Sequence, residues 1–226
     1  MSPLPTVEFP CLWHVGTLDP SQKRRGSYEG AGLSLSRHPG AWRLIARGLV
    51  SGPCWRTEAK GRRLLDAHAL DEEHRAAILG WARTEGLCLA RTMWRHARWD
   101  DEIETEIVQI HASLEDAREE ADWNGEPDEE IGISEIHEHL GTSKLMEAVM
   151  TDNALMGDHA VIEAVLPLWI QTLPDIDGVW WEDRLDVLAY SAPRGCIPAD
   201  KIAQWEFTPT DFEPEDESDL IDEVRD

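Results

Sequence analysis

The clearest hydrophobic pattern of this chain lies in its middle, ahead of Trp123. Apolar residues recur there at steps of four, three, four, three and four, at Ile103, Ile107, Ile110, Leu114, Ala117 and Ala121. This spacing places them on one face of a helix, with acidic residues on the opposite face. The turn signal of residues 124–127 ends the pattern. The sequence therefore predicts one helix here, and we assign Ile103, Ile107, Ile110 and Leu114 to the core.

Helical composition extends to both sides of this segment, whereas short strand-like runs lie near the two ends of the chain. Glycine costs about 1 kcal/mol relative to alanine inside a helix, so glycines divide a long helical run into pieces. The predicted helices are 41–46, 71–99 in two pieces with Asp71 as the cap, 134–140, and one that Asp158 caps and Pro167 kinks or divides. The predicted strands lie within 12–36, separated by a loop, and at 54–57, 61–65, 178–181 and 196–197.

This order of elements indicates an α+β fold with a small, split, mixed sheet. We expect a single domain over residues 1–207, with a long acidic helical insertion at about 67–172. Residues 206–226 hold ten acidic residues and one arginine. Such a composition is typical of a solvated segment, so 208–226 is expected to be a disordered acidic tail.

The charge of the chain is divided between its two halves. Residues 1–98 carry a net charge of +6 and residues 99–226 a net charge of −30. Residues 100–139 alone contain 16 acids and one arginine. The second half is therefore not expected to bind nucleic acid, because phosphate binding needs clustered Lys and Arg. A basic protein that docks on residues 100–139 and the tail is the expected partner.

Mimicry of nucleic acid is a weaker alternative. A helix over 101–123 would carry roughly one charge per 4 Å of its length, against about one per 1.7 Å for duplex DNA. One such helix is too sparse, so mimicry would need the other acidic segments to fold beside it. An ordinary solvated helix face is the simplest interpretation of these acids.

Other features bound the class of protein. The four cysteines Cys11, Cys54, Cys88 and Cys196 form no Cys-x-x-Cys pair, which indicates reduced thiols rather than a zinc ribbon or a disulfide scaffold. No long uninterrupted apolar stretch and no signal-peptide pattern is present, so we expect a cytoplasmic protein without a membrane span. The chain is rich in tryptophan, with 11. Nothing in the sequence indicates the oligomeric state.

Four motifs at the two ends of the chain carry a resemblance. Near the N-terminus they are Leu12-Trp13-His14-Val15-Gly16-Thr17 and Gly30-Ala31-Gly32-Leu33-Ser34-Leu35-Ser36, and near the C-terminus Asp177-Gly178-Val179-Trp180-Trp181 and Ile197-Pro198-Ala199-Asp200-Lys201-Ile202. In their order and spacing they resemble the ends of an ADP-ribosyltransferase fold. In that family a histidine followed by a Gly-Thr step closes the first strand, and a Gly-x-Gly strand lines the nicotinamide pocket.

The resemblance implies that NAD is bound and names the residues that would bind it. His14 would contact the ribose, with Thr17 nearby, and Gly32 would let the backbone approach the nicotinamide. Ser34 stands where the family often has a tyrosine, so Tyr28 or Trp42 would supply the aromatic wall. Arg194 could bind phosphate or could be a surface arginine. A half-buried structural histidine is the alternative for His14.

The sequence departs from the family at the catalytic acid. The glutamate would fall near Ala192 or Pro193, where no acid is present. Glu182, the nearest acid upstream, is the candidate for stabilising the cationic ribose centre, and Glu206 lies downstream. Two functions therefore stay open: an active or degenerate ADP-ribosyltransferase-like protein acting on an unidentified protein or nucleic acid, or a non-enzymatic acidic inhibitor that docks on a basic partner.

No metal site is expected. His137 and His139 have Glu135 and Glu138 beside them. In a helix over 134–140, residues two positions apart do not share a face and could not chelate one ion.

Overall fold

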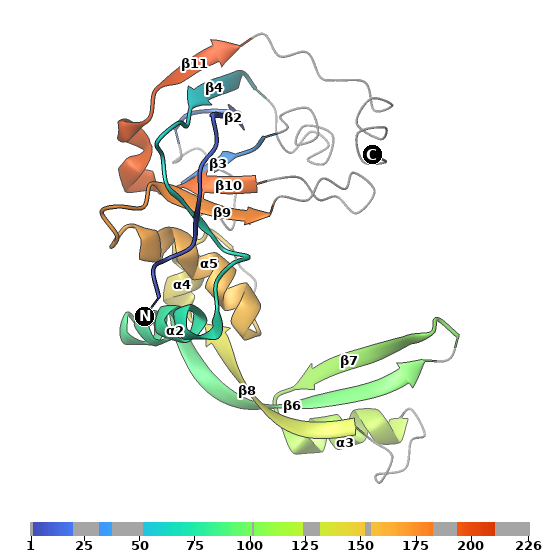
Figure 1. Cartoon of the computed structure of the whole chain (residues 1–226). Coiled ribbons are helices and arrows are strands. Elements are labelled where there is room, and N and C mark those ends of the chain that lie inside the picture. The colour runs from blue at the N-terminus through green and yellow to red at the C-terminus, as the bar shows by residue number, and fades with distance from the viewer. Residues whose placement is uncertain are drawn as a thin grey trace.

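The protein is α+β, as the sequence predicts, and consists of a body and a projecting arm (Figure 1). The computed structural model describes residues 2–19, 32–37, 52–100, 102–123, 132–151, 155–182 and 194–210. The predicted helix at 41–46, the residues Tyr28 and Trp42, and the chain beyond 210 lie outside these ranges.

The centre of the body is a five-stranded mixed sheet. Its order is β1 (Thr6–Val7), β5 (Leu64–Asp66), β9 (Gly178–Glu182), β10 (Arg194–Ile197) and β3 (Leu33–Leu35). The pair β5 and β9 is parallel and the other pairs are antiparallel. Strands from both ends of the chain thus meet in one sheet, in agreement with the strands predicted at those ends.

A second, antiparallel sheet lies against the first, in the order β11 (Phe207–Thr210), β4 (Cys54–Glu58) and β2 (Cys11–Val15). The backbones of Trp13 and Ser36 join the two sheets by exchanging two hydrogen bonds of 2.9 Å. Strand β11 continues the ordered body to Thr210, past the boundary of the predicted tail. Its Pro209 lacks an N–H, and its place in an edge strand is one that proline tolerates. The buried residues on this side are Leu12, Leu35, Ala59, Leu64, Trp180, Ile197 and Trp205.

Three helices and their core cover the other face of the five-stranded sheet: α2 (Glu72–Thr84), α4 (Ser143–Ala148) and α5 (Asp158–Ile170). Helix α5 is the apolar helix predicted after Asp158, but its cap residue is Gly157, and Asp158 lies in its first turn. Pro167 lies inside this helix, which continues to Ile170.

The cap of α2 confirms the prediction for Asp71, whose side chain accepts from the backbone N–H of His74 at 2.8 Å. This bond holds the pKa of Asp71 below its usual value.

A carboxyl group whose pKa is lower in the folded than in the unfolded state stabilises the fold at pH values above the ordinary aspartate pKa. This contribution is lost as the pH falls through the pKa of the folded state. Asp71→Ala should therefore lower the urea midpoint at neutral pH. At about pH 3, below the ordinary aspartate pKa, the difference should shrink; an equal difference at both pH values would contradict this.

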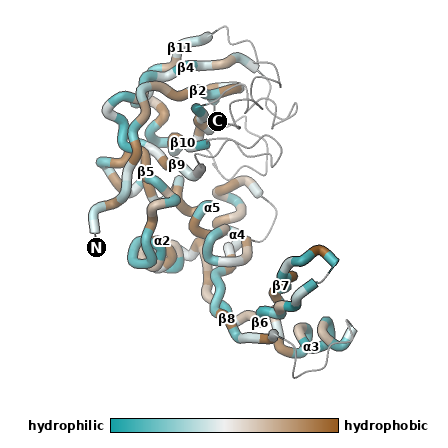
Figure 2. Tube along the Cα trace, turned by 45° about the vertical axis from the view of Figure 1, so that its right-hand side comes forward, coloured by the Kyte–Doolittle hydropathy of each residue, from teal (hydrophilic) through white to brown (hydrophobic). Residues whose placement is uncertain are grey.

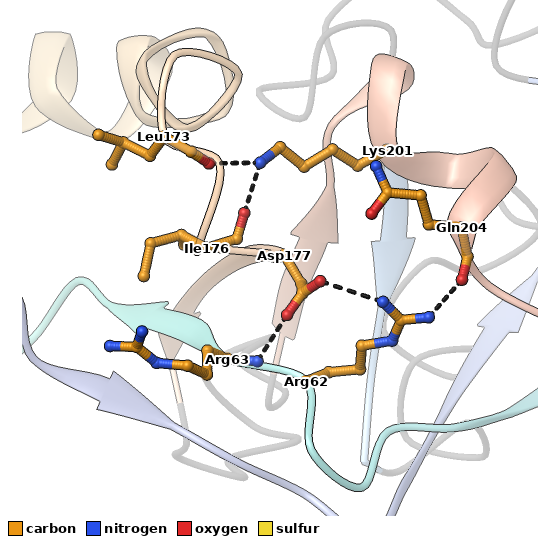
Figure 3. Close-up of polar contacts among 7 residues, drawn as sticks. All are labelled: Arg62, Arg63, Leu173, Ile176, Asp177, Lys201 and Gln204. Carbon is orange, nitrogen blue, oxygen red and sulfur yellow. Dashed lines mark hydrogen bonds and ion pairs between the residues drawn. The ribbon is translucent and has the colours of Figure 1, made fainter.

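A short 3-10 helix, η2 (Ala199–Gln204), closes the body against the chain between α5 and β9 (Figure 3). The buried Lys201 donates through Nζ to the carbonyl oxygens of Leu173 and Ile176, at 2.6 Å each. Arg62 pairs with Asp177 at 3.2 Å and also donates to the carbonyl of Gln204. These contacts tie the C-terminal motif Ile197–Ile202 to the connection that enters β9.

In the arm, strands replace most of the helices that were predicted for the middle of the chain. It consists of β6 (Cys88–Asp100), β7 (Thr105–His111), α3 (Leu114–Trp123) and β8 (Gly132–Gly141), with β6 pairing antiparallel to both other strands. Of the helix predicted before Trp123, only α3 forms, and the predicted helix 134–140 and the second half of 71–99 are strands. Ile103 is exposed, and Ile107, Ile110 and Leu114 are only partly buried, so their assignment to the core is wrong.

The physical reason lies in long-range pairing. Strand β6 pairs with β8 over Cys88–Ala97 and with β7 over Trp94–Asp100, and such pairing can override a local periodicity of three and four residues. The same segment is rich in Thr, Ile, Val and Trp, which favour strands. Of the residues with this spacing, only Ile107 and Ile110 lie in a strand, and Ile103 lies in the turn before it. Leu114, Ala117 and Ala121 lie in α3.

The base of the arm is fixed to the body at the start of α5. Glu138 of β8 accepts from the backbone N–H of Asp158 at 2.9 Å. The carboxylate of Asp158 in turn accepts from the backbone N–H of His139 at 3.0 Å and contacts His139 Nδ1 at 2.7 Å. The last strand of the arm and the first turn of α5 are therefore held by reciprocal bonds.

The four cysteines are free thiols, with Cys54, Cys88 and Cys196 buried and Cys11 partly buried. Burial raises the pKa of the Cys88 thiol. Among the residues that the structure describes, no helix is both long and apolar enough to cross a membrane.

Candidate functional site

His14 lies near the end of β2, at the junction of the two sheets of the body. It is 4% exposed, because side chains alternate between the two faces of a strand, and His14 is on the face of β2 that points between the sheets. Its Nδ1 is 2.8 Å from the carbonyl oxygen of Ser34, and its Nε2 is 2.9 Å from that of Thr17. A neutral ring can donate only one of these bonds, and the imidazolium donates both. The ring is therefore clamped between β3 and the turn that follows β2.

Two glycines allow this turn to pack against the start of β4. Gly16 has a φ of 123° and Gly52 a φ of 129°, values that side chains rarely adopt. A Cβ at Gly52 would lie 3.2 Å from the Cα of Gly16. The N–H of Gly16 donates to the carbonyl of Pro53 at 2.9 Å. The Gly-Thr step of the sequence motif is thus a fixed turn.

Trp55 is an aromatic side chain beside His14 that sequence reasoning missed. The two residues are directly paired across β4 and β2, so their side chains lie on the same face. Trp55 Nε1 donates to the carbonyl of Gly16 at 2.8 Å. The aromatic residues predicted for this place, Tyr28 and Trp42, lie outside the described residues. Pairing the predicted strand 54–57 with the histidine strand would have identified Trp55.

The strand order connects the N-terminal and C-terminal motifs. Ser34 of β3 pairs with Cys196 of β10, and Cys196 pairs with Val179 of β9. Gly32 directly precedes β3 and is buried. His14 therefore contacts Thr17 and Ser34, and Gly32 lies two residues before Ser34 in the chain. Strands β10 and β9 follow β3 in the sheet.

Arg194 is not brought to His14. Its guanidinium pairs with Glu163 of α5 at 2.9 Å and lies 5.6 Å from the centre of the Trp181 ring. Trp181 belongs to the helix-side core, whereas Leu12, on the same face of β2 as His14, belongs to the core between the sheets. Arg194 therefore lies on the opposite face of the five-stranded sheet and binds β10 to α5.

Glu182 is the last residue of β9, and its backbone is opposite Arg194. The pairing shifts between Arg194 and Gly195, because the next pair joins Gly195 with Trp180 and leaves Trp181 as an extra residue. Such bulges redirect a strand and are frequent beside active sites. The predicted position of the family's glutamate, at Ala192 or Pro193, lies outside the described residues.

His137 and His139 lie in strand β8 and not in a helix. Residues two positions apart in a strand share a face, so helix geometry does not exclude a metal ion shared by these two histidines. His139 contacts Asp158, and His137 lies 3.4 Å from the Thr92 hydroxyl and 3.8 Å from Glu135. Within the described ranges, no group of three His, Cys, Asp or Glu side chains is placed to hold a metal ion.

Comparisons of the chain with known protein families, with curated proteins and with solved structures found no match. The strands and side chains of this chain are therefore the basis for inferring its function. Its best-defined polar site is the clamped His14 with Thr17, Ser34 and Trp55 around it.

Proposed function

We propose that the body is an ADP-ribosyltransferase-like domain that binds NAD beside His14. The observation that carries this proposal is the clamp of His14 between β3 and the Gly-Thr turn, at the junction of a split sheet. The resemblance in sequence names the same histidine, the same turn and the same glycine-containing strand. The adjacency of β3, β10 and β9 supports it further, because it places the strands of the C-terminal motifs beside the glycine-containing strand of the N-terminal motifs.

The residues near His14 fit NAD in chemistry. The hydroxyl of Thr17 and the ring of His14 can bond ribose hydroxyls, and Trp55 offers a flat aromatic surface for a nicotinamide ring. Both nitrogens of His14 already contact carbonyl oxygens. Direct contact with the ribose therefore requires that the Nε2 bond to Thr17 be exchanged for one to the ligand.

Catalysis would require a carboxylate in addition. NAD supplies the ADP-ribosyl group, and loss of nicotinamide develops positive charge on the ribose that a carboxylate stabilises. We propose Glu182 for this role, since it ends the strand next to β10. A degenerate relative would bind NAD and release no nicotinamide, and release that persists in Glu182→Gln would exclude this residue.

The test of binding is a thermal-shift titration of the full chain with NAD. A ligand at about a hundredfold excess over its Kd stabilises the folded state by about 2.7 kcal/mol, so the melting temperature of the wild type should rise. The rise should be lost in His14→Ala and kept in His68→Ala, a control at an exposed histidine of the body. Circular dichroism checks that His14→Ala is folded without NAD. A wild type whose melting temperature does not respond to NAD would refute the proposal.

A second function, docking on a basic protein, is favoured by a different observation. The arm projects from the body and carries most of the acidic residues of 100–139 (Figure 1). The comparison with a single charged helix no longer applies, since α3 covers only Leu114–Trp123. We propose that a non-enzymatic, inhibitor-like role would use this arm. If the affinity of the protein for a cationic probe did not change with the salt concentration, charge would not be the driving force of docking.

A further inference from the structure

One face of the outer half of the arm has no element packed on it within the described ranges. Helix α3 covers the opposite face, where Ala117 and Ala121 are buried and Gln109 donates to Glu120 at 3.2 Å. Side chains alternate between the two faces of a strand. His96 of β6 is on the face that α3 covers, so Ala97 and Trp99 are on the open face. Ala97 pairs with Val108 of β7.

Two large apolar side chains meet solvent where this face reaches the tip. Trp99 is 62% exposed and Ile103 is 64% exposed, and Val108, two residues from the β7 partner of Trp99, is exposed as well. We call Trp99, Ile103 and Val108 the tip surface. Brown, apolar positions among teal ones mark the end of the arm in Figure 2. An exposed cluster of this kind marks an interaction site more often than a scattered single residue does.

The turn that presents Ile103 is held by its own bonds. The carboxylate of Asp100 accepts from the backbone N–H groups of Glu102 at 2.9 Å and Ile103 at 3.3 Å. Glu104 follows with a φ of 48°, the left-handed conformation that reverses the chain into β7. Asp100 therefore holds the backbone that presents Ile103.

Carboxylates surround the tip surface. Glu102, Glu104 and Glu106 are exposed in the same hairpin, and Arg95 pairs with Glu106 at 2.9 Å. This charge disfavours nucleic acid, whose phosphates it repels. It also disfavours a second copy of the chain, since the same acids would face each other across the interface.

We propose that the tip surface docks on a protein partner that presents arginine or lysine side chains around an apolar contact. Trp99 and Ile103 enter the apolar contact, and the flanking carboxylates pair with the cations. The face of an indole also attracts a guanidinium, and tryptophans at the centre of an interface often carry much of its binding energy. This inference rests on the proposed docking function and names its surface and its partner chemistry.

The test uses the full chain and a fluorescent peptide of alternating arginine and leucine, with an all-arginine peptide of equal length as comparison. The wild type should bind the Arg-Leu peptide more tightly than the all-arginine peptide, and both affinities should fall with salt. Trp99→Ala and Ile103→Ala should each weaken Arg-Leu binding by about tenfold or more, as loss of an anchor residue does. Trp123→Ala is the matched control, because Trp123 is 88% exposed at the end of α3, and it should bind like the wild type.

The outcomes separate this proposal from the docking function on which it rests. Salt-dependent binding that is equal in the wild type, Trp99→Ala and Ile103→Ala would refute the tip surface and leave charge-driven docking intact. Absence of binding to both cationic peptides would refute both. Self-association of the wild type, or its binding to phosphatidylcholine vesicles, would overturn the proposal if Trp99→Ala abolished it, because the tip would then serve a second copy or a membrane.

Discussion

Lys201→Met is expected to lower the free energy of unfolding by about 2–5 kcal/mol. Methionine has a similar length and fills the same space, but it cannot donate to the carbonyl oxygens of Leu173 and Ile176. Lys201 is only 5% exposed, so water cannot readily replace the ammonium group. The free energy of unfolding falls because two carbonyl oxygens lose a charged donor and cannot bond to water instead. Urea denaturation followed by circular dichroism measures it.

The control for this change is Lys60→Met, at an exposed lysine of the body. Surface substitutions of this kind change stability by about 0.5 kcal/mol or less. If the two variants unfolded at the same urea concentration, the bonds of Lys201 would contribute nothing to the closure of η2 against the body.

Ile170→Ala is the second change with a large expected effect, again about 2–5 kcal/mol. Ile170 lies at the end of α5 and is fully buried in the helix-side core. Removing its outer carbons leaves a cavity that the surrounding residues fill only in part. The matched variant is Ile103→Ala, which removes the same atoms from an exposed residue of the arm and should cost less than about 0.5 kcal/mol. An equally large loss from Ile103→Ala would mean that the tip surface is covered in solution.

The ends of the chain were predictable because their signals are local. Asp71 precedes two glutamates and caps α2 as predicted, and strands β2, β4 and β9 form where short β-favouring runs lie between turn residues. The arm was not predictable in the same way. The isoleucines at 103, 107 and 110 follow helical spacing, and only the antiparallel pairing of β6 with β7 and β8 decides against a helix.

The residues of the candidate site were likewise predictable only in part. His14, Thr17, Gly32 and Ser34 were named from sequence, and in the structure His14 contacts Thr17 and Ser34. Trp55 was missed because its position beside His14 depends on the register of β4 with β2. Arg194 was left open between a phosphate-binding residue and a surface arginine, and its pairing with Glu163 depends on which face of the sheet α5 covers. Lys201 was quoted only as part of a motif, since nothing in a sequence indicates that a lysine will be buried.

The placement of the arm between β5 and β9 has a consequence for the order of folding. Strands β5 and β9 pair in parallel although Arg63 and Asp177 are 114 residues apart, whereas β6 and β7 of the arm are consecutive strands of the chain. Closing a long loop costs more entropy and is slower than forming local pairs. We expect amides of β6 and β7 to gain protection in pulsed hydrogen exchange before those of β5 and β9. On the ribosome the five-stranded sheet cannot be completed until β10 has emerged, so the arm would be the first part of this protein able to meet a partner.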